Sequence, residues 1–315
     1  MRFALGIDLG GTKIEAQLLG PEGDVVWRDR RPTPQGSYAG TLAAIAAQVA
    51  DARTALAGIA PVSQISAGFS IGAGTPGTAG AGGLMKNCNS TCLNGRPLGA
   101  DLAALLGQPV ALANDANCLA LSEATDGAGA GADVVFAVIL GTGVGAGIAV
   151  HGRVLPGANG IAGEWGHNPL PWATAADPAW ACYCGRSGCI ETLLAGPALA
   201  REHAQANGGP AVTALQVAEA AAAGDPAAQA TLARHAERLA RALASVINLL
   251  DPDVIVLAGG LSQLPGLAER VPALWSRWVF GASANEPVRT RLVRSQHGDA
   301  SGVRGAAWLG RQAAA

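Results

Sequence analysis

The segments FALGIDLGGTKIEAQLL, from Phe3 to Leu19, and VVFAVILGTGVGAGIAV, from Val134 to Val150, share one arrangement. In each of them an apolar run leads into a glycine-rich turn, and a second apolar run follows. Short apolar runs bounded by turn residues predict β-strands, so each segment is expected to form a strand–turn–strand hairpin. The recurrence of this unit predicts two similarly built α/β domains in one chain.

The remaining elements are expected from apolar periodicity and from the positions of glycine and proline. The first hairpin is expected to have strands at Phe3–Ile7 and Ile14–Leu19 around a turn at Asp8–Lys13, and the second to have strands at Val134–Leu140 and Ile148–Val150 around a turn at Gly141–Gly147. Further strands are expected at Ile65–Ser70, Val110–Ala113 and Asp253–Leu257, and helices at Thr41–Ala57, Asn117–Ala124, Pro197–Ala223, Pro226–Leu250 and Gly302–Leu309. The stretch Pro171–Ala181 is expected to be an irregular loop.

Length and composition set the broad class of the protein. At 315 residues the chain exceeds the size at which a single core usually keeps growing, which favours two domains. Hydrophobic residues make up 50% of the chain, and the net charge of −2 gives no reason to expect nucleic acid or an anionic membrane as a partner. The sequence shows neither a signal peptide nor a membrane span, so a cytoplasmic location with reduced Cys88, Cys92 and Cys118 is expected.

The first glycine loop has the composition of a phosphate site. In Asp8–Lys13, backbone N–H groups, the Thr12 hydroxyl and the Lys13 ammonium can surround an anion, while Asp8 can hold Mg²⁺ directly or through water. The loop lacks the spacing of a Walker loop, and the strand that follows it argues against a dinucleotide fingerprint. Taken alone, it is more simply interpreted as a hairpin turn.

The second loop, Gly141–Gly147, has the same two interpretations. Because both loops lie between apolar strands, the pair favours a polyphosphate site formed by two domains. The dipeptide Gly259-Gly260, which follows an expected strand, adds a surface of small residues that suits the close approach of a nucleoside. An ordinary turn explains Gly259-Gly260 equally well.

Asp115 is the candidate catalytic base. The run Leu112–Cys118 places this carboxylate where a buried strand ends and a helix begins, and ligands of open α/β sheets collect at the carboxyl ends of strands. There Asp115 can take the proton of a substrate hydroxyl that attacks a γ-phosphoryl group. The alternative is that Asp115 or Asn114 merely caps the following helix.

Four residues form a candidate zinc site. His167, Cys182, Cys184 and Cys189 supply the ligand count of a closed tetrahedral site, and no coordination position is left for substrate. The metal is therefore expected to be structural. Glu164 and Glu191 lie at the two ends of this cluster, which suggests a shaped pocket with polar groups held in place. The alternative is that the cysteines are buried apolar residues and that His167 caps a helix.

Together these motifs closely resemble the ROK family of sugar kinases, within the actin/hexokinase/Hsp70 superfamily. The resemblance spans nearly the whole chain and is carried by Asp8–Lys13, Leu112–Cys118, Gly141–Gly147, Glu164–His167 and Cys182–Glu191. It implies two actin/hexokinase-like (ribonuclease H-like) α/β domains with a cleft between them. The expected division is an N-terminal domain at 1–117, a larger domain with the zinc loop at 118–296, and a C-terminal helix at 297–315 that packs on the N-terminal domain.

The resemblance also implies a role for each motif residue. Asp115 would be the base, and the sugar pocket would be formed by Gly77, Asn89, Asn114, Glu164, His167 and Glu191. ATP and Mg²⁺ would be held by Asp8, Gly10, Gly11, Thr12, Lys13, Gly141, Thr142, Gly143, Gly145, Gly259 and Gly260. His167 would serve twice, with one ring nitrogen on zinc and the other toward the sugar or its neighbours. Zinc would thus lock the segment that carries the sugar ligands.

Three segments, Lys86–Gly95, Gly163–Trp172 and His297–Trp308, look most like bacterial fructokinases of the manno(fructo)kinase type. ATP-dependent phosphorylation of D-fructose to fructose 6-phosphate is therefore expected. One departure is Thr75, which stands where relatives usually have an aliphatic residue in a Gly-Ile-Pro-Gly turn. The alternatives are a kinase for N-acetylglucosamine, N-acetylmannosamine, mannose or glucose and, from another class, a sugar-binding regulator without kinase activity. Family regulators carry an N-terminal helix-turn-helix that this sequence does not show, and a homodimer is implied by the resemblance alone.

Overall fold

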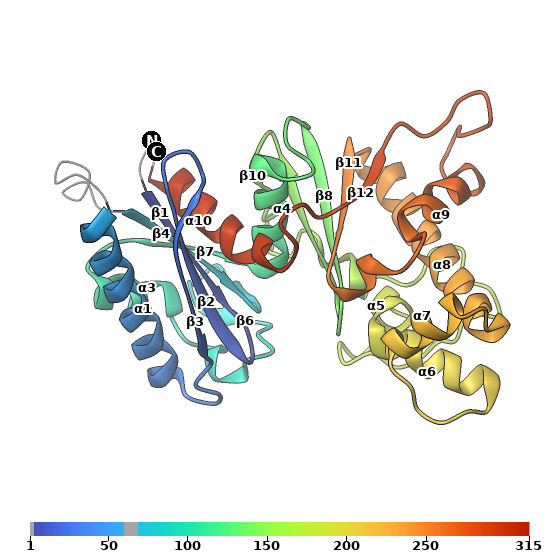
Figure 1. Cartoon of the computed structure of the whole chain (residues 1–315), viewed down its shortest axis with the longest axis horizontal. Helices are drawn as coiled ribbons and strands as arrows, with labels where there is room; N and C mark the ends of the chain where they lie inside the picture. The colour runs from blue at the N-terminus through green and yellow to red at the C-terminus, as the bar shows by residue number, and fades with distance from the viewer. Residues whose placement is uncertain (1–2, 60–68, 315) are drawn as a thin grey trace. The chain divides into compact units, whose positions relative to one another are not determined.

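The computed structural model describes residues 3–59 and 69–314 of the chain. The chain divides into two compact units, each built on its own β-sheet (Figure 1). Unit 1 comprises Met1–Gly127, Arg153–Ala162 and Asp299–Ala315, and unit 2 comprises Ala128–Gly152 and Gly163–Gly298. The first boundary falls ten residues after the expected one at 117, because the helix that begins at Asp115 packs within unit 1. The predicted α/β class is confirmed.

Unit 1 contains a five-stranded sheet of order β3-β2-β1-β4-β7. Its strands are β1 (Phe3–Leu9), β2 (Lys13–Leu19), β3 (Val25–Pro32), β4 (Phe69–Thr75) and β7 (Val110–Asn114). β1 and β2 pair antiparallel as the predicted hairpin, whose turn is shorter than expected because Leu9 and Lys13 already belong to the strands. β4 and β7 continue the sheet in parallel. The expected strand Ile65–Ser70 falls largely on 65–68, which lie outside the described residues.

The helices of unit 1 are α1 (Tyr38–Ile59), α3 (Leu98–Leu106), α4 (Asp115–Asp126) and α10 (Ser301–Ala313). Shorter elements lie around these helices. They are the short strands β5 (Thr78–Ala79), β6 (Met85–Lys86) and β10 (Arg153–Val154) and the 3₁₀ turns Thr91–Leu93 and Gly298–Ala300. Within the part of the chain that the structure describes, α1 alone has the length and composition of a membrane-spanning helix. Ile45 and Val49 of α1 are nevertheless fully buried in one apolar core with Leu5 of β1. Helix α1 thus contributes to the core of unit 1.

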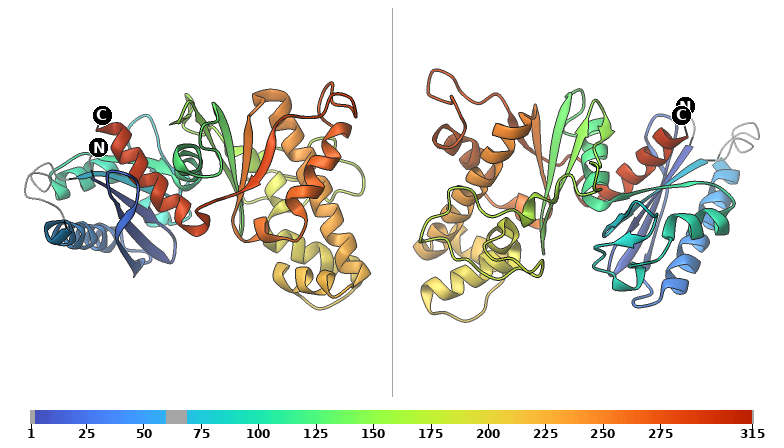
Figure 2. Two further views of the ribbon diagram at one scale, coloured as in Figure 1. Left: turned by 45° about the horizontal axis from the view of Figure 1, so that its top comes forward. Right: turned by 180° about the vertical axis from the view of Figure 1, so that it is seen from behind.

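Helix α10 lies directly on the backbone of β1 and β4 (Figures 1 and 2). Glycine makes this close approach possible. A Cβ atom on Gly6 of β1 would lie 1.9 Å from the Val303 carbonyl oxygen, and a Cβ atom on Gly72 of β4 would lie 1.9 Å from the Ala306 carbonyl oxygen. In the contact between α10 and α4, a Cβ atom on Gly305 would lie 1.7 Å from the Cys118 carbonyl oxygen. Each of these distances is far shorter than any non-bonded carbon–oxygen contact.

We expect Gly305→Ala to destabilise the chain by about 1–3 kcal/mol, because the clash is with backbone and no side-chain rotation relieves it. Alanine is the better helix former by about 1 kcal/mol, so the sign of the effect separates packing from helix propensity. Urea unfolding of both proteins measures the difference. The matched control is Gly58→Ala in α1, where a Cβ atom would meet nothing within 4 Å and the stability should be unchanged or higher. A Gly305→Ala variant as stable as the parent would contradict the close packing of α10 on α4.

Unit 2 contains a sheet in which β9, β8, β11 and β12 are neighbours in that order. The strands are β8 (Val134–Leu140), β9 (Val144–Val150), β11 (Val254–Ala258) and β12 (Arg291–Arg294). The predicted hairpin is confirmed by the antiparallel pairing of β8 and β9. The expected turn Gly141–Gly147 is wrong in its second half, because Gly145 and Gly147 are extended and pair with Ile139 and Ala137 of β8.

The helices of unit 2 are α5 (Ile190–Leu194), α6 (Gly196–Asn207), α7 (Ala214–Ala222), α8 (Pro226–Leu250) and α9 (Leu267–Leu274), with 3₁₀ turns at Glu164–His167, Gly260–Gln263 and Trp275–Arg277. The predicted helix Pro226–Leu250 is confirmed as α8. The single helix expected at Pro197–Ala223 is wrong. Gly208 ends α6 in the left-handed conformation, and Thr213 starts α7 through a capping box with Gln216.

Candidate active site and metal centre

Asp8 is a carboxylate of unit 1 whose pKa is clearly perturbed. It lies near the end of β1, and its backbone is flanked by Glu15 of β2 and Gly74 of β4. Glycine also leaves room for its side chain at α10, since a Cβ atom on Gly302 would lie 3.3 Å from Asp8 Oδ2. Burial, reinforced by the charges of Asp115 and Glu15, raises the pKa of Asp8 to about 6. A bound cation would offset both the cost of burying the Asp8 charge and the repulsion from the other carboxylates, so Asp8 is suited to be a metal ligand.

Asp115 is the first residue of α4 and directly follows β7. The cap of this helix is Asn114, whose Oδ1 accepts a hydrogen bond from the Asn117 N–H at 2.8 Å. Asp115 Oδ1 accepts from the adjacent Ala116 N–H, also at 2.8 Å. The cap of α4 is therefore Asn114 and not Asp115. Asn114 can still donate from its amide nitrogen to a ligand.

The turn after β1 has the open tip expected of an anion loop. Gly11 and Thr12 are exposed, and the Gly10 N–H donates to the Lys13 carbonyl oxygen at 3.0 Å. A Cβ atom on Gly10 would lie 2.9 Å from that oxygen, so the turn favours glycine. Lys13 Nζ lies 3.9 Å from Glu15 Oε2, with which arginines of β3 also pair. The Lys13 ammonium therefore lies beside Glu15, a residue of the same hairpin.

Asn89 lies close to this loop. It lines a cavity of about 260 Å³ in unit 1 together with Gly11 and Thr33. The cavity volume is slightly below the range of about 300–1,000 Å³ that is usual for small-ligand sites. The structure therefore brings one expected sugar residue and the expected phosphate loop to a shared cavity wall.

Thr75 is the last residue of β4, and Gly77 lies in the turn that follows. A Cβ atom on Gly77 would lie 2.5 Å from the Lys86 carbonyl oxygen, so the fold of the β5–β6 hairpin requires glycine there. Thr75 is 1% exposed, and its hydroxyl donates to the Gly77 carbonyl oxygen at 2.8 Å. The unusual threonine thus braces the turn internally through its buried hydroxyl.

In unit 2, the turn between β8 and β9 is bound to a glutamate. Glu191 Oε2, at the start of α5, accepts a hydrogen bond from the Val144 N–H at 2.9 Å. A Cβ atom on Gly143 would lie 2.7 Å from the same oxygen, so glycine is needed to admit the carboxylate. The structure therefore joins an expected sugar residue, Glu191, to the expected phosphate turn Gly141–Gly143 with Thr142 at its centre.

Gly259-Gly260 lies beside that turn. Gly259 has a φ of 81°, and a Cβ atom on it would lie 2.4 Å from the Leu140 carbonyl oxygen. Close packing against β8 thus explains Gly259 without a ligand, and it also places Gly259-Gly260 next to Gly141–Gly143. Gly145 is part of β9, so its expected contact with phosphate has no support from the turn itself.

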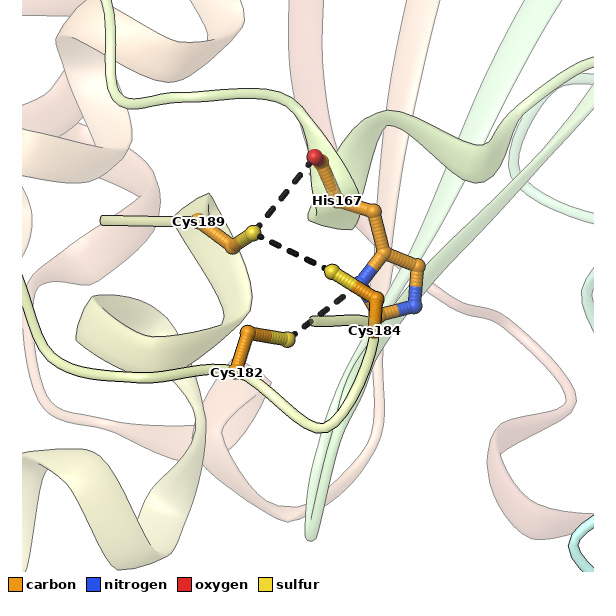
Figure 3. Close-up of side chains that lie close together, drawn as sticks. All are labelled: His167, Cys182, Cys184 and Cys189. Carbon is orange, nitrogen blue, oxygen red and sulfur yellow. Dashed lines mark hydrogen bonds between the residues drawn. The ribbon is translucent and has the colours of Figure 1, made fainter. Parts of the chain in front are cut away.

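The four predicted metal ligands converge in unit 2 (Figure 3). One ligand atom from each of His167, Cys182, Cys184 and Cys189 lies within 4.8 Å of all the others. Cys182 Sγ is 3.6 Å from His167 Nδ1, and Cys184 Sγ is 3.6 Å from Cys189 Sγ. Tetrahedral zinc with ordinary bond lengths separates two thiolates by about 3.8 Å and a thiolate from an imidazole nitrogen by about 3.6 Å. The residues present therefore fit zinc.

The cysteine loop is shaped by two glycines and its own backbone. Gly185 and Gly188 have φ values of 88° and 70°, a conformation that disfavours other residues. The Cys182 N–H donates to the Arg186 carbonyl oxygen at 2.8 Å, which closes the loop around the cysteines. The backbone N–H of Arg186 also lowers the pKa of Cys184, which favours the thiolate form that binds metal.

Tyr183 is a site residue that the sequence analysis missed. Its hydroxyl lies 2.9 Å from His167 Nε2, and the two rings meet edge to face with centroids 5.1 Å apart. Partial burial of the hydroxyl, with the charges of Glu191 and then Glu164, raises the pKa of Tyr183 to about 12. One signal was available: an aromatic residue between two metal-binding cysteines must project from the loop beside the cluster.

Glu164 begins the 3₁₀ turn that ends at His167. This turn lies on β9, because a Cβ atom on Gly163 would be 2.2 Å from the Ala146 carbonyl oxygen and one on Gly166 would be 2.2 Å from that of Val144. Trp165 packs edge to face on Phe136 with ring centroids 5.7 Å apart. Glu164 and His167 are therefore fixed to the sheet from one side and to the cysteine loop from the other.

A buried ion cluster anchors the irregular loop that precedes the cysteines. Asp177 accepts hydrogen bonds from Arg238 Nε at 2.8 Å and from Arg241 Nη1 at 2.9 Å, and these three side chains are at most 4% exposed. Glu202 completes the cluster by pairing with Arg238. Burial alone would raise the pKa of Asp177, but the two guanidinium groups of α8 hold it well below its ordinary value.

We expect Asp177→Asn to lower the free energy of unfolding by about 3–5 kcal/mol at pH 7, because two buried guanidinium groups lose their counter-charge. Since the pKa of Asp177 is lower in the folded state, its contribution is present above the unfolded pKa near 3.9 and decreases below it. The difference between variant and parent should therefore shrink below about pH 4. The control is Glu237→Gln. The carboxylate of Glu237 is 32% exposed and also pairs with Arg241, so its loss should lower the free energy of unfolding by about 0.5 kcal/mol. Equal stability of Asp177→Asn and parent would contradict this account.

Each unit thus gathers its own set of expected residues. Unit 1 contains Asp8, Gly10, Gly11, Thr12, Lys13, Gly77, Asn89, Asn114 and Asp115, and unit 2 contains Gly141, Thr142, Gly143, Gly145, Glu164, His167, Cys182, Cys184, Cys189, Glu191, Gly259 and Gly260. In unit 1, Asp115 acts electrostatically on Asp8. In unit 2, Glu191 links the glycine turn to the segment that carries the metal ligands.

Comparison with known proteins gives matches over nearly the full chain. The sequence model of the ROK family matches residues 4–313. An N-acetyl-D-glucosamine kinase of Pectobacterium atrosepticum is 38% identical over 314 residues, which cover 96% of this chain and 97% of that protein. A ROK hexokinase structure from Thermus thermophilus has a TM-score of 0.82 and 31% identity, with 99% of each chain covered. A ROK family glucokinase structure from Streptomyces griseus, in complex with glucose and AMPPNP, has a TM-score of 0.74 and 29% identity, with 98% of this chain and 99% of that chain covered.

Proposed function

Because this chain belongs to the ROK family, and its relatives and structural neighbours include named sugar kinases, we propose that it transfers the γ-phosphoryl group of ATP to the 6-hydroxyl of a hexose. The observation that carries the proposal is the placement of Asp115. This carboxylate stands at the carboxyl end of β7, it is not the helix cap, and its charge acts on a second carboxylate, Asp8. Two carboxylates in one site allow one to bind a cation and the other to accept a proton.

Asp115 is assigned the role of general base. As the sugar hydroxyl attacks phosphorus, its proton passes to the Asp115 carboxylate, so that the attacking oxygen gains negative charge. Phosphoryl transfer otherwise depends on positioning and on stabilisation of charge. The proposal assigns Asn114, Glu164, His167 and Glu191 to hydrogen bonds with the other sugar hydroxyls and Gly77 and Asn89 to the pocket wall.

Asp8 is the residue proposed to hold Mg²⁺, because its raised pKa reflects a site in which added positive charge is favourable. When bound, the ion supplies neutralising charge for the phosphates of ATP. The turns Gly10–Lys13 and Gly141–Gly143 are proposed to contact those phosphates, with Gly259-Gly260 against the nucleoside. A cytoplasmic location agrees with ATP as donor and with free thiols as metal ligands.

Zinc is proposed as a positioning element. When bound to His167, Cys182, Cys184 and Cys189, it supplies a rigid closure of the cysteine loop. The protein residues do the rest: the turn Glu164–His167 is held on β9, and Glu191 is held by the Val144 N–H. Ligands to the sugar are thereby fixed before the sugar arrives, which reduces the entropy lost in reaching the reactive geometry.

Two sugars are the specific candidates, and they rest on different observations. D-Fructose rests on the three segments that resemble bacterial fructokinases, Lys86–Gly95, Gly163–Trp172 and His297–Trp308. N-Acetyl-D-glucosamine rests on relatives of that name at 37–38% identity over 96% of the chain, so the comparisons support it more directly than fructose. The kinase chemistry is common to both proposals, and the pocket wall decides between them.

The test is sugar-dependent release of ADP from Mg-ATP by zinc-replete protein, with fructose, N-acetylglucosamine, N-acetylmannosamine, mannose and glucose compared by kcat/KM. The proposal expects one of the five to exceed the others by about 10-fold or more, as one well-placed hydrogen-bonding group can discriminate. Fructose in first place supports the segment resemblance, and N-acetylglucosamine in first place supports the relatives. Absence of turnover with all five would overturn the kinase proposal in favour of a sugar-binding regulator.

A further inference from the structure

A second cavity of unit 1 lies at the carboxyl ends of two parallel strands, and we call it the β4–β7 cavity. Its volume is about 420 Å³, which is within the range usual for small-ligand sites. Its wall includes Thr75 at the end of β4, Ala113 near the end of β7, and Thr78, Lys86 and Asn159. Ligands of open α/β sheets collect at such strand ends, so the cavity is a candidate part of the substrate site.

The β4–β7 cavity adjoins residues that are assigned to the sugar. Thr78 directly follows Gly77, and Ala113 directly precedes Asn114, the neighbour of the proposed base. Among the described residues that line the cavity, none belongs to the turn Gly10–Lys13. The cavity is therefore suited to the part of the sugar that is remote from the hydroxyl to which phosphate is transferred.

Lys86 is the one charged residue among the described residues that line this cavity. It pairs with Thr78 across the β5–β6 ladder, so both side chains lie on one face of the hairpin. Lys86 Nζ donates to the Asn159 carbonyl oxygen at 3.1 Å. A Cβ atom on Gly160 would lie 3.3 Å from Thr78 Oγ1, so the loop that carries Asn159 packs closely on the hairpin. The ammonium is thus held at the cavity by a contact between hairpin and loop.

The Lys86 ammonium has donors left for a ligand. Within the part of the chain that the structure describes, it has no carboxylate partner, and only one of its three N–H donors is used on Asn159. An amide carbonyl oxygen is a better partner than a hydroxyl, because it carries no proton that needs an acceptor of its own. Pro156 and Ala79 also line the cavity and offer apolar surface to a methyl group. Together these groups match an acetamido substituent.

Lysine is rare in this chain. Of the 21 lysine and arginine residues, two are lysine, Lys13 and Lys86, and the other 19 are arginine. Arginine presents a planar fork that suits carboxylates and phosphates, whereas lysine presents a compact ammonium. The chain has this compact ammonium at the proposed phosphate turn and at the β4–β7 cavity. Its second occurrence at a cavity wall indicates a specific contact there.

We propose that the β4–β7 cavity binds the acetamido group of an N-acetylhexosamine and that Lys86 donates a hydrogen bond to its carbonyl oxygen. The inference rests on the proposed sugar kinase function and selects N-acetyl-D-glucosamine over D-fructose as its substrate. Lys86 then sets the choice of sugar and takes no part in phosphoryl transfer. A hexose without the acetamido group gains nothing from Lys86, so the two kinds of sugar should respond differently to its loss.

The test is Lys86→Met, which keeps the length of the stem and removes the ammonium. The KM for N-acetylglucosamine should rise about 5- to 20-fold, whereas the KM for glucose, which has a hydroxyl in place of the acetamido group, and the KM for ATP should stay within about 2-fold. Glucosamine should respond in the opposite sense. Its amino group is largely protonated at pH 7, so removal of the Lys86 charge should lower its KM. The matched control is Arg153→Met, which removes an exposed cation of the segment Arg153–Ala162 outside the cavity wall and should change none of these values.

Three results would overturn the inference. An equal rise in the KM for N-acetylglucosamine and for glucose would mean that Lys86 serves the β5–β6 hairpin alone. An unchanged KM for N-acetylglucosamine, or a higher KM for glucosamine, would exclude the contact with the acetamido group. A parent protein that phosphorylates fructose and does not phosphorylate N-acetylglucosamine would overturn the inference and leave the kinase proposal intact.

Failure of the kinase proposal is recognised separately. If the parent protein turns over no sugar, that proposal fails, and the β4–β7 cavity is tested by calorimetric binding of N-acetylglucosamine and glucose. Binding of N-acetylglucosamine that is weaker in Lys86→Met than in Arg153→Met and parent supports the acetamido contact. Binding that is equal in the three proteins, or absent from all of them, overturns it.

Discussion

Asp115→Asn should lower the kcat for sugar phosphorylation by about two to four orders of magnitude, the range for loss of a positioned general base. The substitution keeps the size of the side chain and its acceptor oxygen for the Ala116 N–H, so the start of α4 should be preserved. The KM values for sugar and ATP should change by a few-fold at most. Steady-state kinetics of ADP release, with Asp115→Ala as a second variant, measure the effect.

The stability of the same variant gives an independent check. The charge of Asp115 is one of the causes that raise the pKa of Asp8, so its removal relieves a repulsion in the folded protein without bound metal. Asp115→Asn should therefore unfold at the same or a higher urea concentration than the parent. If Asp115→Asn lost stability together with activity, the result would contradict this expectation, and Asp115 would be a residue that stabilises the fold.

The control for a first-turn aspartate is Asp101→Asn. Asp101 lies in the first turn of α3 in the same unit, where it accepts a hydrogen bond from the Tyr38 hydroxyl at 2.7 Å. Like Asp115 it lies in the first turn of a helix, and it has no role in the proposed chemistry, so the kcat of Asp101→Asn should equal that of the parent. If Asp115→Asn kept more than about a tenth of the parental kcat, the assignment of Asp115 as base would fail.

Much of the framework of both units could be predicted from the sequence. The two hairpins are visible because each has two strand-like runs around glycines, and α8 is visible because its apolar residues recur at helical spacing and Pro226 marks its start. The metal cluster was also predictable, since four ligands with short spacings constrain one another locally. Patterns of this kind depend on neighbours in the sequence, which is why they can be recognised without the fold.

The errors have physical reasons in tertiary packing. Gly145 and Gly147 resemble turn residues, yet they continue β9, because the turn that contains Gly163 and Gly166 packs directly on this strand. The break between α6 and α7 had a local signal at Gly208 that the alanine-rich composition outweighed. The strand β3 was not expected, because its alternation consists largely of charged residues at a sheet edge.

The parts of the site that could not be predicted depend on contacts between distant segments. The close packing of α10 on β1 and β4 becomes evident only in the structure, where Gly6 and Gly72 lie against carbonyl oxygens of the helix. The same holds for Glu191, whose carboxylate binds the Val144 N–H across 47 residues of sequence. The hydrogen bond of Tyr183 to His167 likewise requires the folded loop.

Cys184→Ser should lower the zinc affinity of the chain by about three orders of magnitude, a fraction of the roughly 10–16 kcal/mol with which structural zinc sites bind their metal. Serine keeps the size of the side chain but does not supply a thiolate. The remaining ligands His167, Cys182 and Cys189 cannot close a tetrahedral shell without a fourth group. Zinc content after dialysis against a chelator measures the loss, and Cys92→Ser, which changes a cysteine of unit 1 outside the cluster, should leave it at one ion per chain.

The consequence of zinc loss should appear as a rise in the KM for the sugar together with a lower unfolding temperature. The cysteine loop retains its own backbone bonds, such as Cys182 N–H to Arg186 at 2.8 Å, so the unit should remain folded at low temperature. What it loses is the fixed orientation of His167, and with it the position of Tyr183. Because Asp115 belongs to the other unit, kcat at saturating sugar should fall less than KM rises. Zinc-free parent protein with an unchanged sugar KM would contradict the positioning role, since the histidine would then be held by the protein alone.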